Sequence, residues 1–291
     1  MAEGFAPLRA RRSVLYMPGA NERALEKAKT LDTDSLILDL EDAVAPDAKD
    51  QARDRVCAAA ASGEYGHREI TIRINGIGTA WHDADVAAVV LAKPAAVVVP
   101  KVNTAAEVVA LDAELRAAGA DDELALWAMI ETPEAILNVA QIAAASNRLT
   151  VLVMGTNDLV SELHVRHIPG RLPLITALSQ AVLAARAAGK VILDGVYNDI
   201  KNTEGFAAEC QQGSQLGFDG KTLIHPAQLA GANLAFAPTQ AEIEHAQAVI
   251  DAFQLALAEG RGVVTVNNKM IENMHVTDAQ RVLALAAASA R

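Results

Sequence analysis

Two apolar runs in the sequence lead directly to carboxylates. Residues 125–130, "ALWAMI", are followed by Glu131, and residues 149–154, "LTVLVM", are followed by a short glycine-containing turn and then Asp158. If the runs are adjacent strands of a parallel sheet, both acids lie at the same edge, within a few ångströms of each other. Two carboxylates that close repel unless a proton or a cation lies between them. Mg²⁺ suits such a pair, since proteins hold it with one or two carboxylates, waters and substrate oxygens.

A second interpretation of the two acids stays open at this point. Asp and Glu also favour the first turn of a helix, where the helix dipole is positive, and both acids precede helix-like segments. Spacing alone does not decide between a metal site and a pair of helix N-termini. The same residues suit Mn²⁺ as well as Mg²⁺, because both are ions that prefer oxygen ligands.

An arginine and further acids follow other apolar runs. Arg73 lies within "IRINGIG", and a buried arginine requires an anionic partner. That partner is either Glu41 or Asp42, or a substrate carboxylate or developing oxyanion that the guanidinium would grip as a fork. The segment "DLEDAV" brings these acids together with Asp39. Such a cluster requires cations, so we expect it to hold Arg73, Lys101 or metal-bound waters in place.

Composition limits the classes of partner. The chain of 291 residues has a net charge of −11, which argues against general nucleic-acid binding. Residues 9–29 are an exception, with six basic residues against Glu22 and Glu26. This segment is either a solvated basic arm or a local site for an anion such as a phosphate.

Targeting signals and cysteine usage favour a cytoplasmic protein. The first residues, "MAEGFAPLRARRS", contain no apolar core of a secretory signal, and no apolar stretch approaches the ~20 residues that cross a membrane. Cys57 and Cys210 lie in alanine-rich, helix-like segments. They are typical of reduced thiols and not of a disulfide framework.

Eight short apolar runs alternate with helix-like segments. Mostly continuous apolar runs are typical of parallel strands buried on both faces. Eight repeats in a chain of this length predict a closed (β/α)₈ barrel; a doubly wound open sheet is the alternative, but "YMPGANER" at 16–23 lacks the dinucleotide-binding glycine pattern. The predicted strands are 13–17, 35–40, 69–74, 95–100, 124–130, 149–154, 190–194 and 220–225.

The C-terminal region does not continue this alternation. We assign residues 1–235 to the barrel and 236–291 to an extension. The extension begins with a long amphipathic helix, with Thr239 as its candidate N-cap. A short hairpin around Asn267 and Asn268 and a final helix follow. We expect this extension to act as a lid that packs on a neighbouring subunit.

Several of these segments recur together as longer motifs in chain order, and they cover nearly the whole sequence. They are "RRSVLYMPGANERALEKA" at 11–28, "LILDLEDAVAPDAKDQAR" at 36–53, "IRING" at 72–76, "KV" at 101–102, "AMIETPEAI" at 128–136, "GTNDL" at 155–159, "GKTLIHPAQL" at 220–229 and "KMIEN" at 269–273.

This set resembles the citrate lyase β-subunit-like proteins, a family that includes malyl-CoA, citramalyl-CoA and related CoA-ester lyases. The resemblance implies a (β/α)₈ barrel that forms trimers or hexamers and carries Mg²⁺ at its mouth. It implies a CoA thioester and a 2-oxo acid as small-molecule partners, while the acidic charge and the absence of a long apolar stretch argue against nucleic-acid and membrane partners. By the same resemblance, Glu131 and Asp158 are the metal ligands.

The resemblance also assigns binding roles. It places Arg73 on the carboxylate or carbonyl of the 2-oxo acid, beside Glu131, Gly155 and Thr156. It places coenzyme A against Tyr16, Arg23, Lys27, Ile224 and His225. The acids Asp39, Glu41 and Asp42 and the cation of Lys101 would surround these groups.

One position departs from the family. Many members carry an aspartate in a C-terminal "MID" segment, where it is the catalytic carboxylate supplied by a neighbouring subunit. Here the segment reads Met270-Ile271-Glu272. Glutamate keeps the acid and adds a methylene, so Glu272 is the candidate base.

The implied reaction is reversible Claisen-type cleavage of a 3-hydroxyacyl-CoA to acetyl- or propionyl-CoA and a 2-oxo acid. Three alternatives remain: hydrolysis of a malyl-CoA-type thioester, action as a citrate lyase β subunit on an acyl-carrier-protein thioester, and a barrel that binds CoA without turnover.

Overall fold

The computed structural model describes residues 9–267 and 269–290. Residues 1–8, which fall in the range predicted for the barrel, and Asn268 of the predicted hairpin lie outside the described residues. The chain divides into two compact units, one formed by Arg11–Phe236 and the other containing the residues from Ala237 onward.

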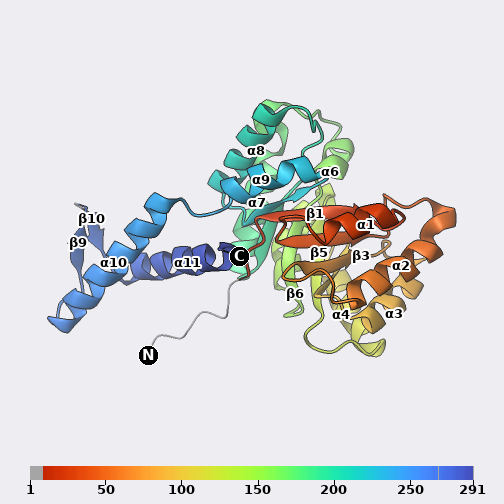
Figure 1. Cartoon of the computed structure of the whole chain (residues 1–291), viewed down its shortest axis with the longest axis horizontal. Helices are drawn as coiled ribbons and strands as arrows, with labels where there is room; N and C mark the ends of the chain where they lie inside the picture. The colour runs from red at the N-terminus through yellow and green to blue at the C-terminus, as the bar shows by residue number, and fades with distance from the viewer. Residues whose placement is uncertain (1–8, 268, 291) are drawn as a thin grey trace. The chain divides into compact units, whose positions relative to one another are not determined.

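The first unit is a closed barrel of eight parallel strands (Figure 1). Each strand pairs with the next along the chain, and β1 pairs with β8 to close the ring. The predicted (β/α)₈ barrel is therefore confirmed. The strands are β1 (Ser13–Pro18), β2 (Ser35–Asp39), β3 (Glu69–Arg73), β4 (Ala96–Val99), β5 (Ala125–Ile130), β6 (Leu149–Met154), β7 (Val191–Asp194) and β8 (Gly220–Leu223).

Helices follow the strands and surround the barrel (Figure 1). They are α1 (Glu22–Ala28), α2 (Lys49–Ala61), α3 (His82–Ala92), α4 (Ala105–Ala117), α5 (Pro133–Ala144), α6 (Thr156–Glu162), α7 (Ile175–Ala187), α8 (Thr203–Leu216) and α9 (Leu229–Ala235). Short 3₁₀ turns lie at η1 (Pro46–Ala48), η2 (Pro169–Leu174) and η3 (Pro226–Gln228).

Local sequence signals explain where the helices begin and end. Thr104 and Glu107 form a reciprocal capping box at the start of α4. The helices α4 and α7 end one residue before a C-cap alanine, and Gly119 and Gly189 follow with positive φ, which glycine adopts without a steric cost.

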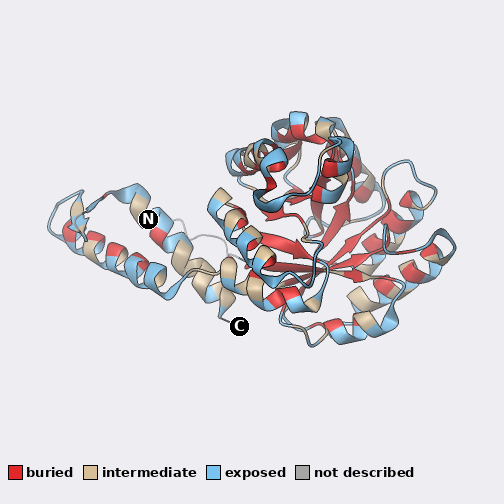
Figure 2. Cartoon of the chain, turned by 90° about the horizontal axis from the view of Figure 1, so that it is seen from above, coloured by how far each residue is buried: buried red, intermediate tan, exposed pale blue. Residues whose placement is uncertain are grey.

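The strands are buried on both faces, as the continuous apolar runs predict (Figure 2). Successive side chains of a strand point to opposite faces, so one set fills the barrel interior and the other packs on the helices. The interior set is Val14, Ile37, Ala96, Val98, Trp127, Met129, Val151, Val153 and Leu193. A larger cluster joins the outer faces of the strands to the helices. This alternation determines which residues at the strand ends face the barrel axis.

The second unit is a helical hairpin with a small antiparallel ribbon. It contains α10 (Gln240–Ala258), β9 (Val264–Val266), β10 (Lys269–Ile271) and α11 (Asn273–Ser289). The Thr239 side chain accepts a hydrogen bond from the backbone of Glu242, as expected for the predicted N-cap. Phe253 and Ile271 lie in the small apolar core of this unit.

Two further features bear on the sequence predictions. No helix among residues 9–267 and 269–290 combines the length and apolarity needed to cross a lipid bilayer. Cys57 and Cys210 are free thiols. Burial raises the pKa of Cys57 to about 11 and that of Cys210 to about 12, so both favour the neutral, unreactive form.

Candidate active site

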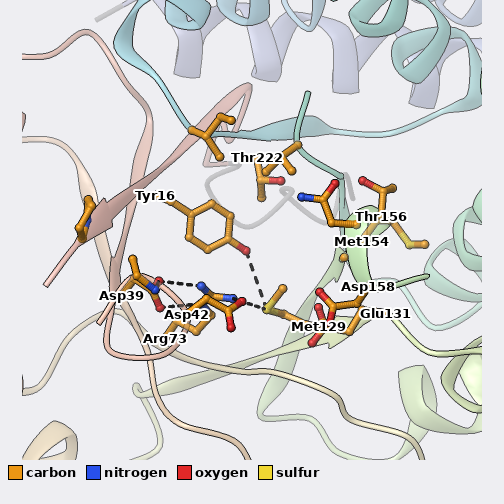
Figure 3. Close-up of a pocket in the computed structure, with 16 residues that line it drawn as sticks. Tyr16, Asp39, Asp42, Arg73, Met129, Glu131, Met154, Thr156, Asp158 and Thr222 are labelled. Atoms are coloured by element: carbon orange, nitrogen blue, oxygen red, sulfur yellow. Dashed lines mark hydrogen bonds and ion pairs between the residues drawn. The ribbon is translucent and has the colours of Figure 1, made fainter. Parts of the chain in front are cut away.

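A cavity of about 350 Å³ opens at the carboxyl ends of the barrel strands (Figure 3). Every strand except β4 contributes to its wall, either directly or through the loop that follows it. The lining residues are Tyr16, Pro18, Asp39, Asp42, Ala43, Arg73, Met129, Glu131, Met154, Gly155, Thr156, Asn157, Asp158, Val196, Thr222 and Ile224. The structure thus brings together most of the residues predicted for the site, and Glu41 and Lys101, which are absent from the wall, directly contact wall residues.

The two-residue period of the strands explains why the polar groups face inward. Tyr16 lies two positions after Val14, and Asp39 lies two positions after Ile37, both of which fill the barrel interior. Glu131 follows Trp127 and Met129 in the same alternation. Asp39 also pairs in register with Arg73 of the neighbouring strand, so the two side chains lie at the same level of the barrel.

Glu131 and Asp158 lie side by side at one wall of the cavity (Figure 3). Glu131 is almost completely buried, whereas Asp158 is partly exposed. Burial, followed by the nearby charge of Asp158, raises the pKa of Glu131 to about 8. This carboxyl group therefore requires a proton or a cation near neutral pH, as the sequence predicts for two converging acids.

The helix-capping interpretation fails for Glu131. The N-cap of α5 is Thr132, whose hydroxyl accepts a hydrogen bond from the backbone of Ala135. Glu131 instead accepts a hydrogen bond of 2.8 Å from the backbone N–H of Lys101, on the neighbouring β4–α4 loop. Asp158 does lie in the first turn of α6, so the helix dipole and the cavity both act on that residue.

Gly155 has a steric role at this wall. A Cβ atom on Gly155 would overlap the side chain of Glu131. The family resemblance connects this glycine with the 2-oxo acid, but the group that it accommodates in the structure is Glu131. Glycine here allows β6 and β5 to present their acids at adjacent positions.

Arg73 is held by the acids of the β2–α2 segment. Its Nε and Nη2 donate to the two carboxylate oxygens of Asp39, at 2.7 and 2.6 Å. Its Nη1 lies 2.7 Å from Glu41 and 3.4 Å from Asp42. The two predicted partners are therefore present, but the bidentate partner is Asp39. This pairing holds the guanidinium plane while Nη1 remains at the cavity.

Glu41 is the least satisfied of these acids. Its Oε2 is buried and makes no hydrogen bond of good geometry, although it lies close to Arg73. Burial outweighs the attraction of Arg73 and raises the pKa of Glu41 to about 7. Glu41 is therefore partly protonated near neutral pH.

The ring of Tyr16 packs against the guanidinium of Arg73. The Arg73 Cζ atom lies 4.9 Å from the centre of the Tyr16 ring, within the range of a cation–π contact. The Tyr16 hydroxyl donates to the Met129 sulfur at 3.8 Å (Figure 3). Burial raises the pKa of Tyr16 well above its usual value, so this group stays neutral.

The residues predicted to bind coenzyme A occupy two places. Tyr16 and Ile224 line the cavity. Arg23 and Lys27 are exposed on α1 and lie one turn apart, outside the cavity wall. His225 is exposed after β8, and its Nδ1 accepts a hydrogen bond from the backbone of Ala227.

Glu272 belongs to the second unit and is not among the residues that line the cavity. It is exposed at the N-cap position of α11, and its backbone N–H donates to Nδ1 of His275 at 3.0 Å. Its assignment as the catalytic base stays a prediction.

The structure adds wall residues that the sequence did not reveal, chiefly Met129, Asn157, Val196 and Thr222. Counting by twos along each strand would have identified Met129 and Thr222. Asp194, which ends β7, does not join the cavity wall. It follows the inward-facing Leu193, so it points outward to a buried ion cluster with Arg171 and Lys221.

The donor set fits a magnesium ion but not a closed structural metal site. Among the described residues, no group of three or more His, Cys, Asp and Glu side chains could hold a metal ion. Two carboxylates leave the other coordination positions to waters and substrate oxygens, which is how proteins usually hold Mg²⁺. Burial and the nearby charge of Asp158 raise the pKa of Glu131, so a cation at this pair would stabilise its ionised form.

Known proteins resemble the chain over nearly its whole length. It is 50% identical over 279 residues to a (3S)-malyl-CoA thioesterase of Cereibacter sphaeroides, covering 96% of this chain and 95% of that protein. It is 38% identical over 283 residues to the citrate lyase subunit beta of Escherichia coli K12, covering 96% and 94%.

Solved structures show the same likeness. The protein CitE from Mycobacterium tuberculosis, solved in complex with magnesium, acetoacetate and coenzyme A, superimposes with a TM-score of 0.76 at 28% identity, covering 96% of this chain and 98% of that one. Residues 12–226 match the family described as HpcH/HpaI aldolase/citrate lyase. The barrel, the full-length relatives and this match together show that the chain belongs to the HpcH/HpaI aldolase/citrate lyase family.

Proposed function

We propose that the protein is a magnesium-dependent CoA-ester lyase that reversibly cleaves a carbon–carbon bond in a 3-hydroxyacyl-CoA of the malyl, methylmalyl or citramalyl type. The observation that carries the proposal is the pair Glu131 and Asp158, which faces Arg73 across one cavity. The magnesium and coenzyme A in the related CitE structure support the choice of cofactor and substrate class.

Glu131 and Asp158 would hold the ion between them. When bound, Mg²⁺ would supply Lewis-acid polarisation of the carbonyl oxygen of a 2-oxo acid. The Glu131 carboxylate is already oriented for metal binding, because one of its oxygens accepts a hydrogen bond from the backbone N–H of Lys101.

Arg73 would stabilise charge on the substrate. Asp39 occupies its Nε and Nη2, so Nη1 is the part of the guanidinium that can turn to a substrate oxygen. Glu41, the nearest acid to Nη1, has a pKa of about 7 and therefore competes weakly when protonated. A preorganised donor of this kind typically contributes on the order of 10²–10³ in rate.

Glu272 would move the proton on the CoA side. In the synthetic direction its carboxylate takes a proton from the α-carbon of the acyl-CoA, and the electron pair left on that carbon forms the new bond to the carbonyl carbon of the 2-oxo acid. The carbonyl oxygen gains a proton from solvent water and becomes the hydroxyl of the product. Cleavage reverses each transfer, with Glu272 returning its proton to the α-carbon.

Coenzyme A would lie along the basic part of the N-terminal region. Arg23 and Lys27 present two exposed cations on one face of α1, immediately after the strand that carries Tyr16. Such cations suit phosphate groups on an otherwise acidic chain. We also propose that the protein is cytoplasmic and forms a homotrimer or hexamer, in which the 236–291 extension brings Glu272 to the cavity of a neighbouring subunit.

Hydrolysis is the second candidate function. The observation that favours it is the 50% identity to a protein named (3S)-malyl-CoA thioesterase. The same cavity would bind the thioester, and Glu272 would activate a water that attacks the thioester carbon. The products would then be malate and free coenzyme A in place of glyoxylate and acetyl-CoA.

One assay separates these reactions. Purified protein is incubated with malyl-, methylmalyl-, citramalyl- and citryl-CoA in Mg²⁺, and the 2-oxo acid, acyl-CoA, hydroxy acid and free coenzyme A are quantified. Lyase activity gives a 2-oxo acid and a shorter acyl-CoA in equal amounts. Free malate and coenzyme A would replace the lyase proposal with hydrolysis. Inertness towards all four esters would favour the citrate lyase β-subunit alternative, in which the substrate is an acyl-carrier-protein thioester; the 38% identity to a citrate lyase subunit beta supports this alternative.

The metal assignment has its own test. Asp158→Ala is expected to keep the circular dichroism spectrum of the fold and to lower Mg²⁺-dependent turnover by about 10²-fold or more. Asp122→Ala is the matched control, because Asp122 is a highly exposed acid in the loop before β5, outside the cavity. Unchanged turnover in Asp158→Ala would refute the ligand assignment.

A further inference from the structure

Lys101 adopts an unusual backbone conformation at the edge of the site. It follows β4 by two residues and has a φ of 52°, in the left-handed region. A non-glycine residue rarely adopts this conformation, and such residues concentrate where a particular geometry is required. The left-handed conformation of Lys101 therefore indicates a specific structural requirement at this position.

This conformation lets one residue contact both acids of the pair. The backbone N–H of Lys101 donates to Oε1 of Glu131 at 2.8 Å. Its side-chain Nζ lies 3.4 Å from Oδ1 of Asp158. Glu131 follows β5 and Asp158 lies in the first turn of α6, so Lys101, from the loop after β4, bridges the two proposed metal ligands.

The two contacts differ in strength. The backbone contact has an ordinary hydrogen-bond length and involves an almost completely buried carboxylate. The ammonium contact is longer than the 2.7–2.9 Å typical of charge-assisted hydrogen bonds, and the Lys101 side chain is 53% exposed. The ammonium is therefore held loosely and can leave, while the backbone contact stays.

The Lys101 ammonium also supplies positive charge beside the two acids. Arg73, the cation in the wall of the cavity, is already paired with Asp39. The charge beside Asp158 that can offset repulsion between the two acids is therefore that of Lys101. A divalent ion bound by Asp158 would have to displace this charge and would then be repelled by it.

We propose that Lys101 is a positioning residue that substitutes for the metal ion at the acid pair and competes with it. The ammonium keeps Glu131 and Asp158 close together when no ion is bound, and it weakens Mg²⁺ binding to that pair. The inference rests on the proposed function for the identity of the metal.

The expected size of the effect follows from the exposure of the pair. Exposed ion pairs of this kind correspond to a factor of about two to five in an equilibrium constant. Removing the ammonium should therefore tighten Mg²⁺ binding by about two- to fivefold. It should also destabilise the metal-free protein, because Asp158 then loses its ion pair.

Lys101→Asn is the test variant, since asparagine tolerates the left-handed conformation and keeps the backbone N–H. Mg²⁺ is titrated into metal-free protein by calorimetry, and the melting temperature is measured in EDTA and in excess Mg²⁺. The variant is expected to bind Mg²⁺ two- to fivefold more tightly and to gain more thermal stability from Mg²⁺ than the wild type. Lys101→Arg, which keeps the charge, should bind like the wild type.

The chain offers a matched control at the other end of the same strand. Lys93 precedes β4, also has a left-handed φ of 50°, and lies 3.6 Å from Asp121 through its Nζ. Lys93→Asn therefore repeats the substitution, the backbone conformation and the loose ion pair away from the cavity. Its Mg²⁺ affinity should match that of the wild type.

The outcomes distinguish this inference from the function on which it rests. Equal or weaker Mg²⁺ binding by Lys101→Asn, with normal binding by the wild type, would overturn the role of Lys101 and leave the metal site standing. Failure of the wild type to bind Mg²⁺ would overturn the proposed function and this inference together. If Lys101→Asn does not fold, Lys101→Gly provides the same comparison, because glycine adopts this φ without strain.

Discussion

The guanidinium of Arg73 is fixed by carboxylates from one short segment that begins with the last residue of β2. Asp39 takes two of its nitrogens, and Glu41 and Asp42 lie near the third. Asp39 is buried and also accepts the backbone N–H groups of Glu41 and Ala43. One carboxylate therefore orients both the arginine and the loop beside it.

This arrangement predicts a specific defect in Asp39→Asn. Asparagine replaces one of the two acceptor oxygens by an NH₂ donor, so the two-oxygen pairing with the guanidinium is lost and Arg73 loses its fixed plane. We expect kcat to fall by at least about tenfold, while calorimetric Mg²⁺ affinity stays within about twofold, because Glu131 and Asp158 are untouched. A parallel loss of metal affinity would show that Asp39 supports the whole site and not Arg73 in particular.

Glu41 gives a pH dependence whose sign can be worked out. Its pKa is raised from 4.5 to about 7 in the folded protein. Between these values the folded protein keeps a proton that the unfolded chain has lost, so the free energy of unfolding falls as pH rises from about 4.5 to about 7. Glu41→Gln removes this contribution.

The variant is therefore expected to gain thermal stability over the wild type as pH rises from 5 to 8. The gain should be a few degrees in melting temperature, measured in EDTA so that bound metal does not contribute. Glu123→Gln, at an exposed loop position, serves as the control. Melting curves of wild type and Glu41→Gln that stay parallel across this range would contradict the raised pKa.

Individual residues of the site differ in how far the sequence reveals them. Glu131, Asp158 and Arg73 follow or end apolar runs, so the amino-acid pattern alone predicts their place at one rim. The bidentate role of Asp39 is not predictable in this way, since three acids within four residues are equivalent in the pattern. The double contact of Lys101 depends on a left-handed φ that its residue type does not indicate.

At the scale of strands and helices, the apolar runs predict all eight strands to within one or two residues at each end. The place of an acid at the end of a strand does not by itself decide whether its side chain enters the cavity. Asp194 ends β7 as Glu131 follows β5, but its side chain points outward to Arg171. In a fully buried strand, the sequence does not distinguish inward-facing from outward-facing positions, because both faces are apolar.

The junction of β6 and α6 yields a prediction at this scale. Gly155→Ala would drive a methyl group into Glu131, so the acid or the start of α6 must move. We expect Mg²⁺ affinity to fall by about tenfold or more, as it does when groups that orient metal ligands are lost. Gly76→Ala is the control, because its added methyl would make only ordinary contact with Pro100. If Gly155→Ala keeps the wild-type Mg²⁺ affinity, the side chains at this wall can rearrange around the added methyl group.

The whole molecule raises the question of where Glu272 acts. It lies in the second compact unit, and the resemblance to the family predicts that it serves the cavity of a neighbouring subunit. In that arrangement each active site combines residues from two chains. Two different inactive variants could then restore one intact site between them.

We therefore expect complementation between Glu272→Gln and Asp158→Ala. Each variant alone should be almost inactive, and co-refolded mixtures should recover turnover several-fold above either parent. Mixing Asp158→Ala with Arg73→Ala, both in one barrel, should recover nothing. The absence of recovery in the first mixture, when mixed oligomers are shown by mass spectrometry, would place Glu272 in the site of its own chain or outside any site.

Closure of the barrel through β1 and β8 has a consequence for biosynthesis. Ser13 pairs with Lys221, more than 200 positions later in the chain. Until the ribosome has released β8, a growing polypeptide holds an incomplete sheet with two unpaired edges, which is a template for aggregation. Val14 and Thr222 pair across this seam, so the emerging chain should depend on chaperones until β8 has been translated.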